Sequence, residues 1–341
     1  MEAKDIAIMD LPGLEKILSA PSEAASQALA GVHGNILVLG AAGKMGPTLA
    51  MMLRKAAPKR NICAASRFSD NAVKTKLEQA GIATVAADLL DQAQYWKLPN
   101  VENVFFLAGM KFGAAGDLPL TWAQNTYIPA LVAGHYKHSR IVVFSTGNVY
   151  PFVDINGTGA TEDTPTDPVG EYAQSCLGRE RMFQYFSDIH GTPVTIIRLN
   201  YANEPRYGII VDLTLKILND EPIDLTMGAV NLIWQRDAND YIICSITLAQ
   251  SPPAVLNVAG PQTISIRSLA GKIASLLGKE PKFVSQEAPS ALLSDASRCI
   301  SLFGAPQTTL DQMVATIVEW VRSGKETLNK PTKYDVRNGK F

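Results

Sequence analysis

From residue 35 onward, short continuous runs of Val, Ile and Leu alternate with longer segments of helical periodicity. Such runs are typical of parallel strands that helices cover on both faces. The sequence therefore predicts strands at residues 35–39, 62–65, 83–87, 104–107, 141–145, 194–199 and 254–258. Helices are expected at residues 44–57, 72–80, 120–138, 169–189, 266–277 and 310–323. Together these elements indicate βαβ units and an α/β fold with a parallel sheet.

Composition and charge narrow the range of partners. The chain has 341 residues, of which 47% are apolar and 18% charged, an ordinary composition for a globular protein. Its net charge of −1 provides no field for nucleic acid or an anionic membrane, so neither is expected as a partner. No apolar run reaches the roughly 18 residues of a membrane span, and residues 1–30 lack the pattern of a secretory signal. We therefore expect a cytoplasmic protein.

The cysteines and histidines indicate neither a disulfide framework nor a metal site. The cysteines are widely scattered and form no Cys-x-x-Cys pair. His135 and His138 share a helix face by their spacing, but no carboxylate accompanies them. We interpret both as surface histidines and expect no metal.

A glycine-rich turn, GAAGKMG at residues 40–46, joins the first predicted strand to the first predicted helix. Glycines let the backbone approach a pyrophosphate, and the N-terminus of the helix offers free N–H groups and positive partial charge. Because the motif lies within a βαβ unit, it predicts dinucleotide binding. The residues expected to contact the ligand are Gly40, Ala42, Gly43, Lys44, Met45 and Gly46.

Further motifs follow the turn along the chain. They are residues 106–111 (FLAGMK), Asn125, 144–150 (FSTGNVY), 171–180 (EYAQSCLGRE), 198–201 (RLNY), 236–240 (RDAND) and 256–259 (LNVA). In order and spacing they resemble the extended short-chain dehydrogenase/reductase family, also called the NAD(P)-dependent epimerase/dehydratase family, over roughly residues 35–325.

The resemblance implies a Rossmann-type doubly wound parallel sheet with a smaller C-terminal substrate-binding cap. The dinucleotide-binding domain would cover residues 33–200, with residues 232–260 returning to it, and the cap residues 201–231 and 261–325. Residues 1–32 would form a helical extension, with pieces at 11–18 and 23–30, that docks on the domain surface or acts as an oligomer arm. Residues 326–341 would form a polar tail whose end is solvated.

The resemblance also implies a nicotinamide cofactor. Beyond the glycine-rich turn, the residues expected to contact it are Asp88, Leu89, Leu107, Ala108, Gly109, Lys111, Ser145 and Asn200.

The end of the second predicted strand distinguishes NAD from NADP, because a carboxylate there would bond the adenosine ribose of NAD. The chain has Ser66 and Arg67 instead. Arg67 could meet the 2′-phosphate of NADP, and Lys44 would add positive charge nearby. NADP is therefore favoured. NAD is the alternative, with Arg67 at the surface and Asp70 recruited to the ribose.

The catalytic residues that the resemblance implies are Tyr172, Thr146 and Asn125. The family pairs its tyrosine with a lysine four residues later, on the same helix face, where this chain has Cys176. A free phenol has a pKa of about 10, so a tyrosine base needs a nearby cation, and a cysteine provides none.

Three consequences of the missing lysine stay open. Another cation, Lys111 or Arg179, substitutes for it; the protein keeps its cofactor without redox activity; or Cys176 is itself a reactive thiol, although buried cysteines are usually apolar fillers. If another cation substitutes, we expect an NAD(P)-dependent oxidoreductase or epimerase/dehydratase that acts on a hydroxyl or carbonyl of a sugar, nucleotide sugar or similar small molecule. If redox activity is lost, we expect a catalytically weak or silent NAD(P)-binding protein that acts as a nucleotide-responsive regulator.

The cap and the long helices carry two further expectations. Asn203, Glu204, Arg206 and Tyr207 could all face the substrate. As in similar proteins, a homodimer is expected through a four-helix bundle formed by residues 120–138 and 169–189 and their symmetry mates.

Overall fold

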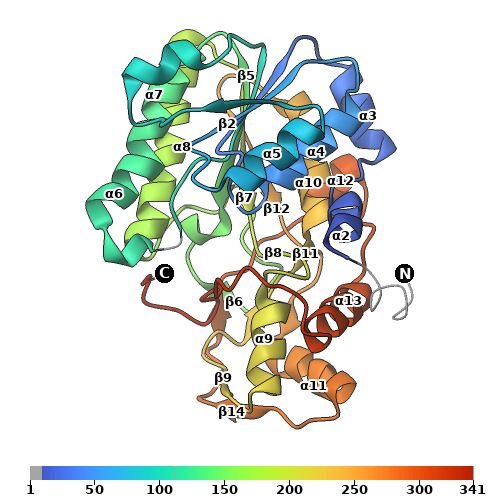
Figure 1. Cartoon of the computed structure of the whole chain (residues 1–341). Coiled ribbons are helices and arrows are strands. Elements are labelled where there is room, and N and C mark those ends of the chain that lie inside the picture. Colours follow the sequence, from blue (N-terminus) through green and yellow to red (C-terminus); the bar gives the residue numbers. More distant parts are fainter. Residues whose placement is uncertain (1–9, 112, 341) are drawn as a thin grey trace.

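The computed structural model of the protein describes residues 10–111 and 113–340 (Figure 1). Its centre is a seven-stranded sheet in the order β12-β7-β5-β4-β1-β2-β3, in which all neighbours pair in parallel. The strands are β1 Ile36–Leu39, β2 Ile62–Ser66, β3 Ala83–Ala86, β4 Asn103–Phe106, β5 Arg140–Thr146, β7 Val194–Leu199 and β12 Ala254–Val258. All seven predicted strands are therefore present, and the Rossmann-type doubly wound sheet is confirmed.

Helices cover both faces of this sheet (Figure 1). On one face lie α4 Gly46–Ala56, α5 Asn71–Gln79 and α10 Gln235–Cys244; on the other lie α6 Leu118–Trp122, α7 Ile128–His135 and α8 Gly170–His190. Alternate side chains of β1 show why its whole sequence is apolar. Ile36 and Val38 belong to the core beneath α4, whereas Leu37 and Leu39 belong to the core beneath α7.

The predicted helix at residues 120–138 differs in detail from the structure. Between α6 and α7 the chain forms a π-helical turn, Ala123–Tyr127, and α7 ends at His135. Pro129, in the first turn of α7, has no N–H to donate to the carbonyl of Asn125 four residues earlier, so an α-helical ladder cannot continue there. The wider turn contains Asn125, one of the predicted site residues.

A second core lies below the sheet. It is formed mainly by α9 Ile209–Leu218, α11 Ile266–Leu277 and α13 Leu310–Arg322. Short elements complete this part of the chain and its junction with the sheet: β6 Val153–Asp154, β8 Ala202–Asn203, β9 Pro222–Asp224, β10 Ala229–Val230, β11 Ile233–Trp234, β13 Ile264–Ser265, β14 Lys282–Val284, β15 Ser290–Ala291 and α12 Ser297–Phe303. The predicted boundaries between domain and cap stay a prediction.

The N-terminal helices, α2 Leu11–Leu18 and α3 Glu23–Ala30, connect the two cores. Leu14 and Leu18 pack into the lower core, and Leu29 packs into the core beneath α4. Glu15 pairs with Lys76 at 2.6 Å. Residues 10–30 therefore dock on their own chain, as the first of the two alternatives predicted, while residues 1–9 of the predicted extension lie outside the described part. Of the helices in the described ranges, none is sufficiently long and apolar to cross a membrane.

The C-terminal tail is packed, so the expectation of a solvated end is wrong. It runs from α13 across the front of the molecule to the ends of α6 and α8 (Figure 1). Thr332 and Tyr334 are each only 2% exposed. The Thr332 N–H and hydroxyl donate to the Asp212 carboxylate at 2.8 and 2.5 Å, and Arg337 donates to the Ser290 carbonyl at 2.6 Å. Burial of the Tyr334 ring in the lower core offsets the entropy lost by ordering a polar segment.

Candidate active site

Two cavities lie at the carboxyl ends of the central strands, where the order of the sheet reverses between β1 and β4. The first, of about 290 Å³, is called the crevice cavity here. Most of its lining was predicted from the sequence as cofactor-binding: Gly40, Ala42, Gly43, Ser66, Arg67, Asp88, Leu89, Leu107, Ala108 and Gly109. The loops after β1, β2, β3 and β4 thus meet in one place, although they are far apart in sequence.

The glycines of the turn have different structural roles. Gly40 has a φ of +82°, and a Cβ there would lie 2.5 Å from the Ala108 N, so only glycine lets the loops after β1 and β4 touch. A Cβ on Gly46 would collide with the Ala41 carbonyl, and Gly46 lines neither cavity. Gly43 lines the crevice cavity, and an added Cβ would meet only the Gly40 carbonyl oxygen, at 3.3 Å. One side of Gly43 is therefore open to a ligand.

Basic and acidic side chains are unequally distributed around the crevice cavity. Arg67 is exposed at the end of β2 and lines the cavity. Asp70 does not line it; its carboxylate accepts the Ala72 N–H at 2.8 Å and caps α5. Lys44, which was predicted to add charge near Arg67, lines the second cavity instead.

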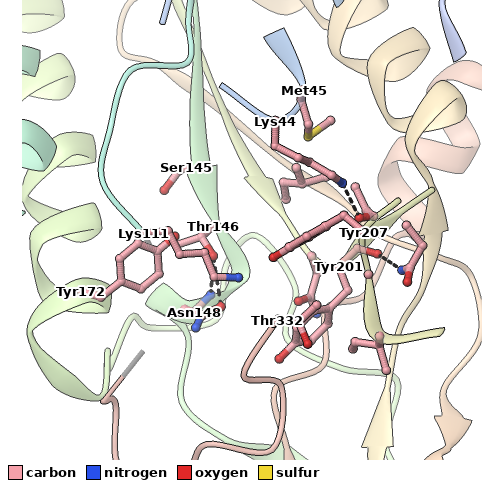
Figure 2. Close-up of a pocket in the computed structure, with 16 residues that line it drawn as sticks. Lys44, Met45, Lys111, Ser145, Thr146, Asn148, Tyr172, Tyr201, Tyr207 and Thr332 are labelled. Carbon is pink, nitrogen blue, oxygen red and sulfur yellow. Dashed lines mark hydrogen bonds between the residues drawn. The ribbon is translucent and has the colours of Figure 1, made fainter. Parts of the chain in front are cut away.

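The second cavity, of about 190 Å³, lies between the sheet and α9 and is called the cap cavity here. Its lining comprises Lys44, Met45, Lys111, Ser145, Thr146, Asn148, Tyr172, Leu199, Asn200, Tyr201, Ala202, Asn203, Tyr207, Gly208, Ile209 and Thr332. Figure 2 shows Tyr172, Lys111 and Thr146 on one side, facing Tyr207, Tyr201 and Thr332 on the other. The sequence-predicted tyrosine, its partner hydroxyl and one of the two candidate substitute cations therefore converge.

Tyr172 lies on α8 with Cys176 one turn later on the same face. Burial raises the pKa of Tyr172 well above its usual value, the Cys176 thiol raises it further, and the charge of Arg179 opposes both. Burial also raises the pKa of the Cys176 thiol, which is fully buried. A buried, protonated thiol is a poor nucleophile, which argues against a reactive cysteine at this position.

Two lysines give the cap cavity its positive character. The Lys44 ammonium donates to the Ala202 carbonyl at 2.7 Å and lies 4.6 Å from the centre of the Tyr207 ring. Burial lowers the pKa of Lys44 to about 7 and that of Lys111 to about 8, with nearby carboxylates opposing the change. Among the described residues, no aspartate or glutamate lines this cavity. A bound anion would stabilise the charged form of both lysines.

Two predicted residues at the end of β5 are held by neighbouring polar groups. The Thr146 hydroxyl donates to the Asn148 side-chain oxygen at 3.1 Å and accepts the Asn148 N–H at 3.2 Å. The Ser145 hydroxyl donates to Glu180 at 2.5 Å, and Glu180 forms a buried ion pair with Arg198 at 2.8 Å. Ser145 thus lines the cavity while it anchors α8 to the sheet.

Asn125 lies beneath the site and lines neither cavity. It is fully buried; its side-chain oxygen accepts from the Met110 N–H at 2.7 Å and from Arg179 at 2.8 Å, and its amide donates to Ser175 at 3.0 Å. Arg179 also donates to the Phe144 carbonyl at 2.6 Å. The geometry makes Asn125 a residue that positions the loop after β4 and Arg179, and its catalytic role stays a prediction.

The structure also divides the four residues expected to face the substrate. Asn203 and Tyr207 line the cap cavity, whereas Arg206 forms an ion pair with the buried Glu204 at 3.0 Å and another with Glu15 at 3.3 Å. Glu15 belongs to the N-terminal extension, and no local sequence pattern predicts its ion pair with Arg206.

Several lining residues were not predicted. In the crevice cavity they include Phe68, Gln124 and Lys330; in the cap cavity they include Asn148, Tyr201 and Thr332. Asn148 could have been found, because it lies inside the FSTGNVY segment. The two tail residues could not, because no motif connects them to the sheet. Within the described residues, no group of three or more His, Cys, Asp or Glu side chains is placed to hold a metal ion.

Comparison with known proteins extends these observations. Among solved structures, MoeE5 in complex with UDP-glucose and NAD is 23% identical with a TM-score of 0.70, over 85% of this chain and 99% of that one. UDP-glucuronic acid 4-epimerase from Bacillus cereus, in complex with UDP-glucuronic acid and NAD, is 18% identical with a TM-score of 0.71, over 84% and 99%. At these identities the structures establish a shared fold.

Sequence comparison identifies the family. No curated protein matches the chain by sequence. A profile of the NAD dependent epimerase/dehydratase family matches residues 36–224, which is more than half of the chain. The matched region contains the glycine-rich turn, the loop after β4 and the helix that carries Tyr172. The chain therefore belongs to the NAD dependent epimerase/dehydratase family.

Proposed function

We propose that the protein is an NAD(P)-dependent oxidoreductase or epimerase/dehydratase that acts on a hydroxyl or carbonyl of a sugar or nucleotide sugar. The observation that carries this proposal is the meeting of Tyr172, Thr146 and Lys111 in one cavity, beside the crevice where the sheet order reverses. Ligands of doubly wound folds bind at such a reversal.

The crevice cavity fits a dinucleotide. Its glycine turn leads into α4, whose N-terminal N–H groups favour a pyrophosphate, and the open side of Gly43 leaves room for one. Gly40 to Gly43 would hold the phosphates, and Asp88 and Leu89 the adenine side. When bound, a nicotinamide cofactor supplies hydride transfer.

NADP is the form that the lining of the crevice cavity favours. Arg67 stands at the end of β2, and Asp70, the carboxylate that NAD would recruit, caps α5 instead. Replacing Arg67 with alanine is expected to cost about 1.5–3 kcal/mol of NADP affinity, as for a lost charged hydrogen bond. The affinity for NAD should stay unchanged and is the internal control. Both affinities would be measured by calorimetry. Equal losses for both cofactors would show that Arg67 does not select the phosphate.

In the proposed reaction, Tyr172 exchanges a proton with the substrate oxygen and Thr146 fixes that oxygen by a hydrogen bond. Two charges take over part of the missing lysine's electrostatic role. Lys111 lines the same cavity, and Arg179 lowers the pKa of Tyr172 from beneath the loop. Because burial outweighs Arg179, Tyr172 is protonated at neutral pH, which suits it to donate a proton during carbonyl reduction.

A nucleotide sugar is the substrate class that the cap cavity supports. Lys44 and Lys111 line it, and among the described residues no carboxylate does, so an anionic substrate is favoured. The structures of MoeE5 and of the UDP-glucuronic acid 4-epimerase contain UDP-sugars. A diphosphate would provide the anion that the two lysines require.

A thermal-shift panel tests the proposal. The protein would be heated with NAD, NADP, NADH and NADPH, and then with nucleotide sugars in the presence of the best cofactor. A ligand that binds only the folded state raises the melting temperature. At a ligand concentration of 100 Kd, the free energy of unfolding increases by about 2.7 kcal/mol. A shift with one cofactor and a further shift with one sugar nucleotide would support the proposal. No shift with any cofactor would refute it.

A second candidate function is a nucleotide-responsive binding protein without turnover. The specific observation that favours it is Cys176, which stands buried beside Tyr172 in place of a lysine and raises the pKa of the phenol. This candidate predicts the same cofactor shift in the thermal panel but no turnover with any carbonyl, alcohol or nucleotide sugar.

A homodimer through α6, α7 and α8 is also proposed. These helices lie side by side at one edge of the molecule (Figure 1). α8 exposes Tyr185 and Ile189 at 56% and 51%, and the turn between α6 and α7 exposes Tyr127 at 53%. Exposed aromatic and aliphatic side chains on neighbouring helices are what an interface would bury. Light scattering at micromolar concentration should give twice the chain mass, and the double variant Tyr185→Asp, Ile189→Asp should give the monomer mass. Trp96→Asp, at an exposed position outside these helices, is the matched control. A parent that is already monomeric would contradict the proposal.

A further inference from the structure

The C-terminal tail crosses the junction of the two cavities. Lys330 lines the crevice cavity and Thr332 lines the cap cavity. Both also line a third cavity, of about 170 Å³, together with Lys111 and Lys333. Figure 2 shows Thr332 close to Tyr201 and Tyr207, across the cavity from Tyr172. Residues 329–333 of the tail therefore lie between the place expected for the adenosine half of a dinucleotide and the catalytic tyrosine.

Hydrogen bonds on both sides of Lys330 fix this part of the tail. The Leu328 N–H donates to the Arg206 carbonyl at 2.9 Å. On the other side, Thr332 donates twice to Asp212 on α9. The backbone that carries Lys330 is thus attached to the lower core at two points, two residues away in each direction. Lys330 therefore lines the crevice from a segment that is fixed on both sides.

Three charged residues line the crevice cavity: Arg67, Asp88 and Lys330. Arg67 stands at the β2 end of the cavity. Asp88 is the carboxylate in its lining, and it accepts the Leu90 N–H at 3.0 Å. Lys330 shares the third cavity with Lys111, which adjoins Tyr172 in the cap cavity. Lys330 therefore lies between the adenosine end and the reactive end, and the pyrophosphate is the part of a dinucleotide that lies between its two nucleosides.

We propose that Lys330 binds the pyrophosphate of the dinucleotide, so that the C-terminal tail completes a cofactor site whose other parts come from the sheet. This inference rests on the proposed function. The glycine turn offers N–H groups to the crevice, and Lys330 adds a compact positive charge from the tail.

Binding measurements on the full chain test the inference. NADPH and NADH would be titrated by fluorescence, and adenosine and adenosine 2′-phosphate, which lack the pyrophosphate, by competition. Lys330→Ala should weaken the dinucleotides about 3- to 10-fold, less than for a buried charged pair because Lys330 is exposed. It should leave both adenosine compounds unchanged. Lys330→Arg should keep most of the affinity. Lys340→Ala removes an exposed lysine of the same tail that lines none of these cavities, and it should have no effect.

Two results would overturn the inference while leaving the proposed function intact. One is a Lys330→Ala variant that binds the dinucleotides as tightly as the parent. The other is an equal loss for the adenosine compounds, because the tail would then act on the shape of the whole crevice rather than on the pyrophosphate. A parent that binds none of the four compounds would refute the proposed function and this inference together.

Discussion

Replacing Gly43 with aspartate is expected to abolish the binding of NADP and NAD while the protein stays folded. Gly43 lines the crevice cavity, and its φ lies outside the left-handed region, so a side chain is compatible with its backbone. An added Cβ would meet only the Gly40 carbonyl oxygen, at 3.3 Å, which a small shift relieves. The new carboxylate would stand at the N-terminus of α4, where we expect the pyrophosphate, and would repel it.

The measurement is a cofactor titration combined with a melting curve of the unliganded protein. Gly43→Asp should melt close to the parent and show no shift with cofactor. Gly43→Ala adds the same Cβ without the charge, and it should keep part of the affinity. Gly40→Ala is a contrast, because its Cβ would lie 2.5 Å from the Ala108 N and would disturb the fold itself. If Gly43→Asp bound NADP or NAD as tightly as the parent, the assignment of the crevice cavity would be wrong.

The sheet was predictable because it depends on short-range patterns. A strand covered on both faces must be apolar at every position, and β1 shows this directly, with alternate side chains in two different cores. The glycine turn was predictable for a similar reason. The contact of Gly40 with the loop after β4 leaves no room for a Cβ, so the local sequence carries the constraint. Ten predicted cofactor residues consequently line one cavity.

Side-chain direction and long-range contacts were not predictable from the same patterns. Lys44 lies in the glycine turn, yet its ammonium points to Ala202 in the cap cavity instead of toward Arg67, because a turn residue can face either side of the sheet edge. The order of the tail depends on the bond from Thr332 to Asp212, across 120 residues of sequence. A polar segment of this kind has no periodicity that would indicate burial.

The role of Asn125 illustrates a third limit. The family resemblance implies a catalytic role for Asn125, which stays a prediction, and the structure adds that its side chain is buried among Met110, Ser175 and Arg179. Arg179 is the group that this arrangement orients, since Asn125 and the Phe144 carbonyl hold its guanidinium. The charge that lowers the pKa of Tyr172 is thus held by a π-helical turn that the predicted uninterrupted helix lacked.

Turnover is expected to fall by about 10²–10⁴ when Tyr172 is replaced with phenylalanine, the usual range for loss of an acid/base group. The phenol is the titratable hydroxyl that faces Lys111 and Thr146 in the cap cavity (Figure 2), and phenylalanine removes its proton while keeping the ring. The affinity for the cofactor, measured by the thermal shift, should change little. Tyr185→Phe, which alters an exposed tyrosine on the same helix that lines neither cavity, is the matched control and should retain the turnover.

The pH dependence provides the sharper measurement. Burial and Cys176 raise the pKa of Tyr172 well above its ordinary value, so at neutral pH the phenol is in its acid form. In the direction that needs a base, the rate should therefore rise with pH far into the alkaline range. In the direction that needs an acid, Tyr172 itself should cause no change of rate through neutrality, so that any change there reports the titration of Lys44 and Lys111. Cys176→Lys places a cation one turn along the same helix face, which lowers the pKa of Tyr172 and should move the alkaline limb toward neutral pH. Unchanged turnover in Tyr172→Phe would refute the catalytic role. Tight cofactor binding without turnover, even in Cys176→Lys and across a broad panel of carbonyls, alcohols and nucleotide sugars, would favour the binding protein instead.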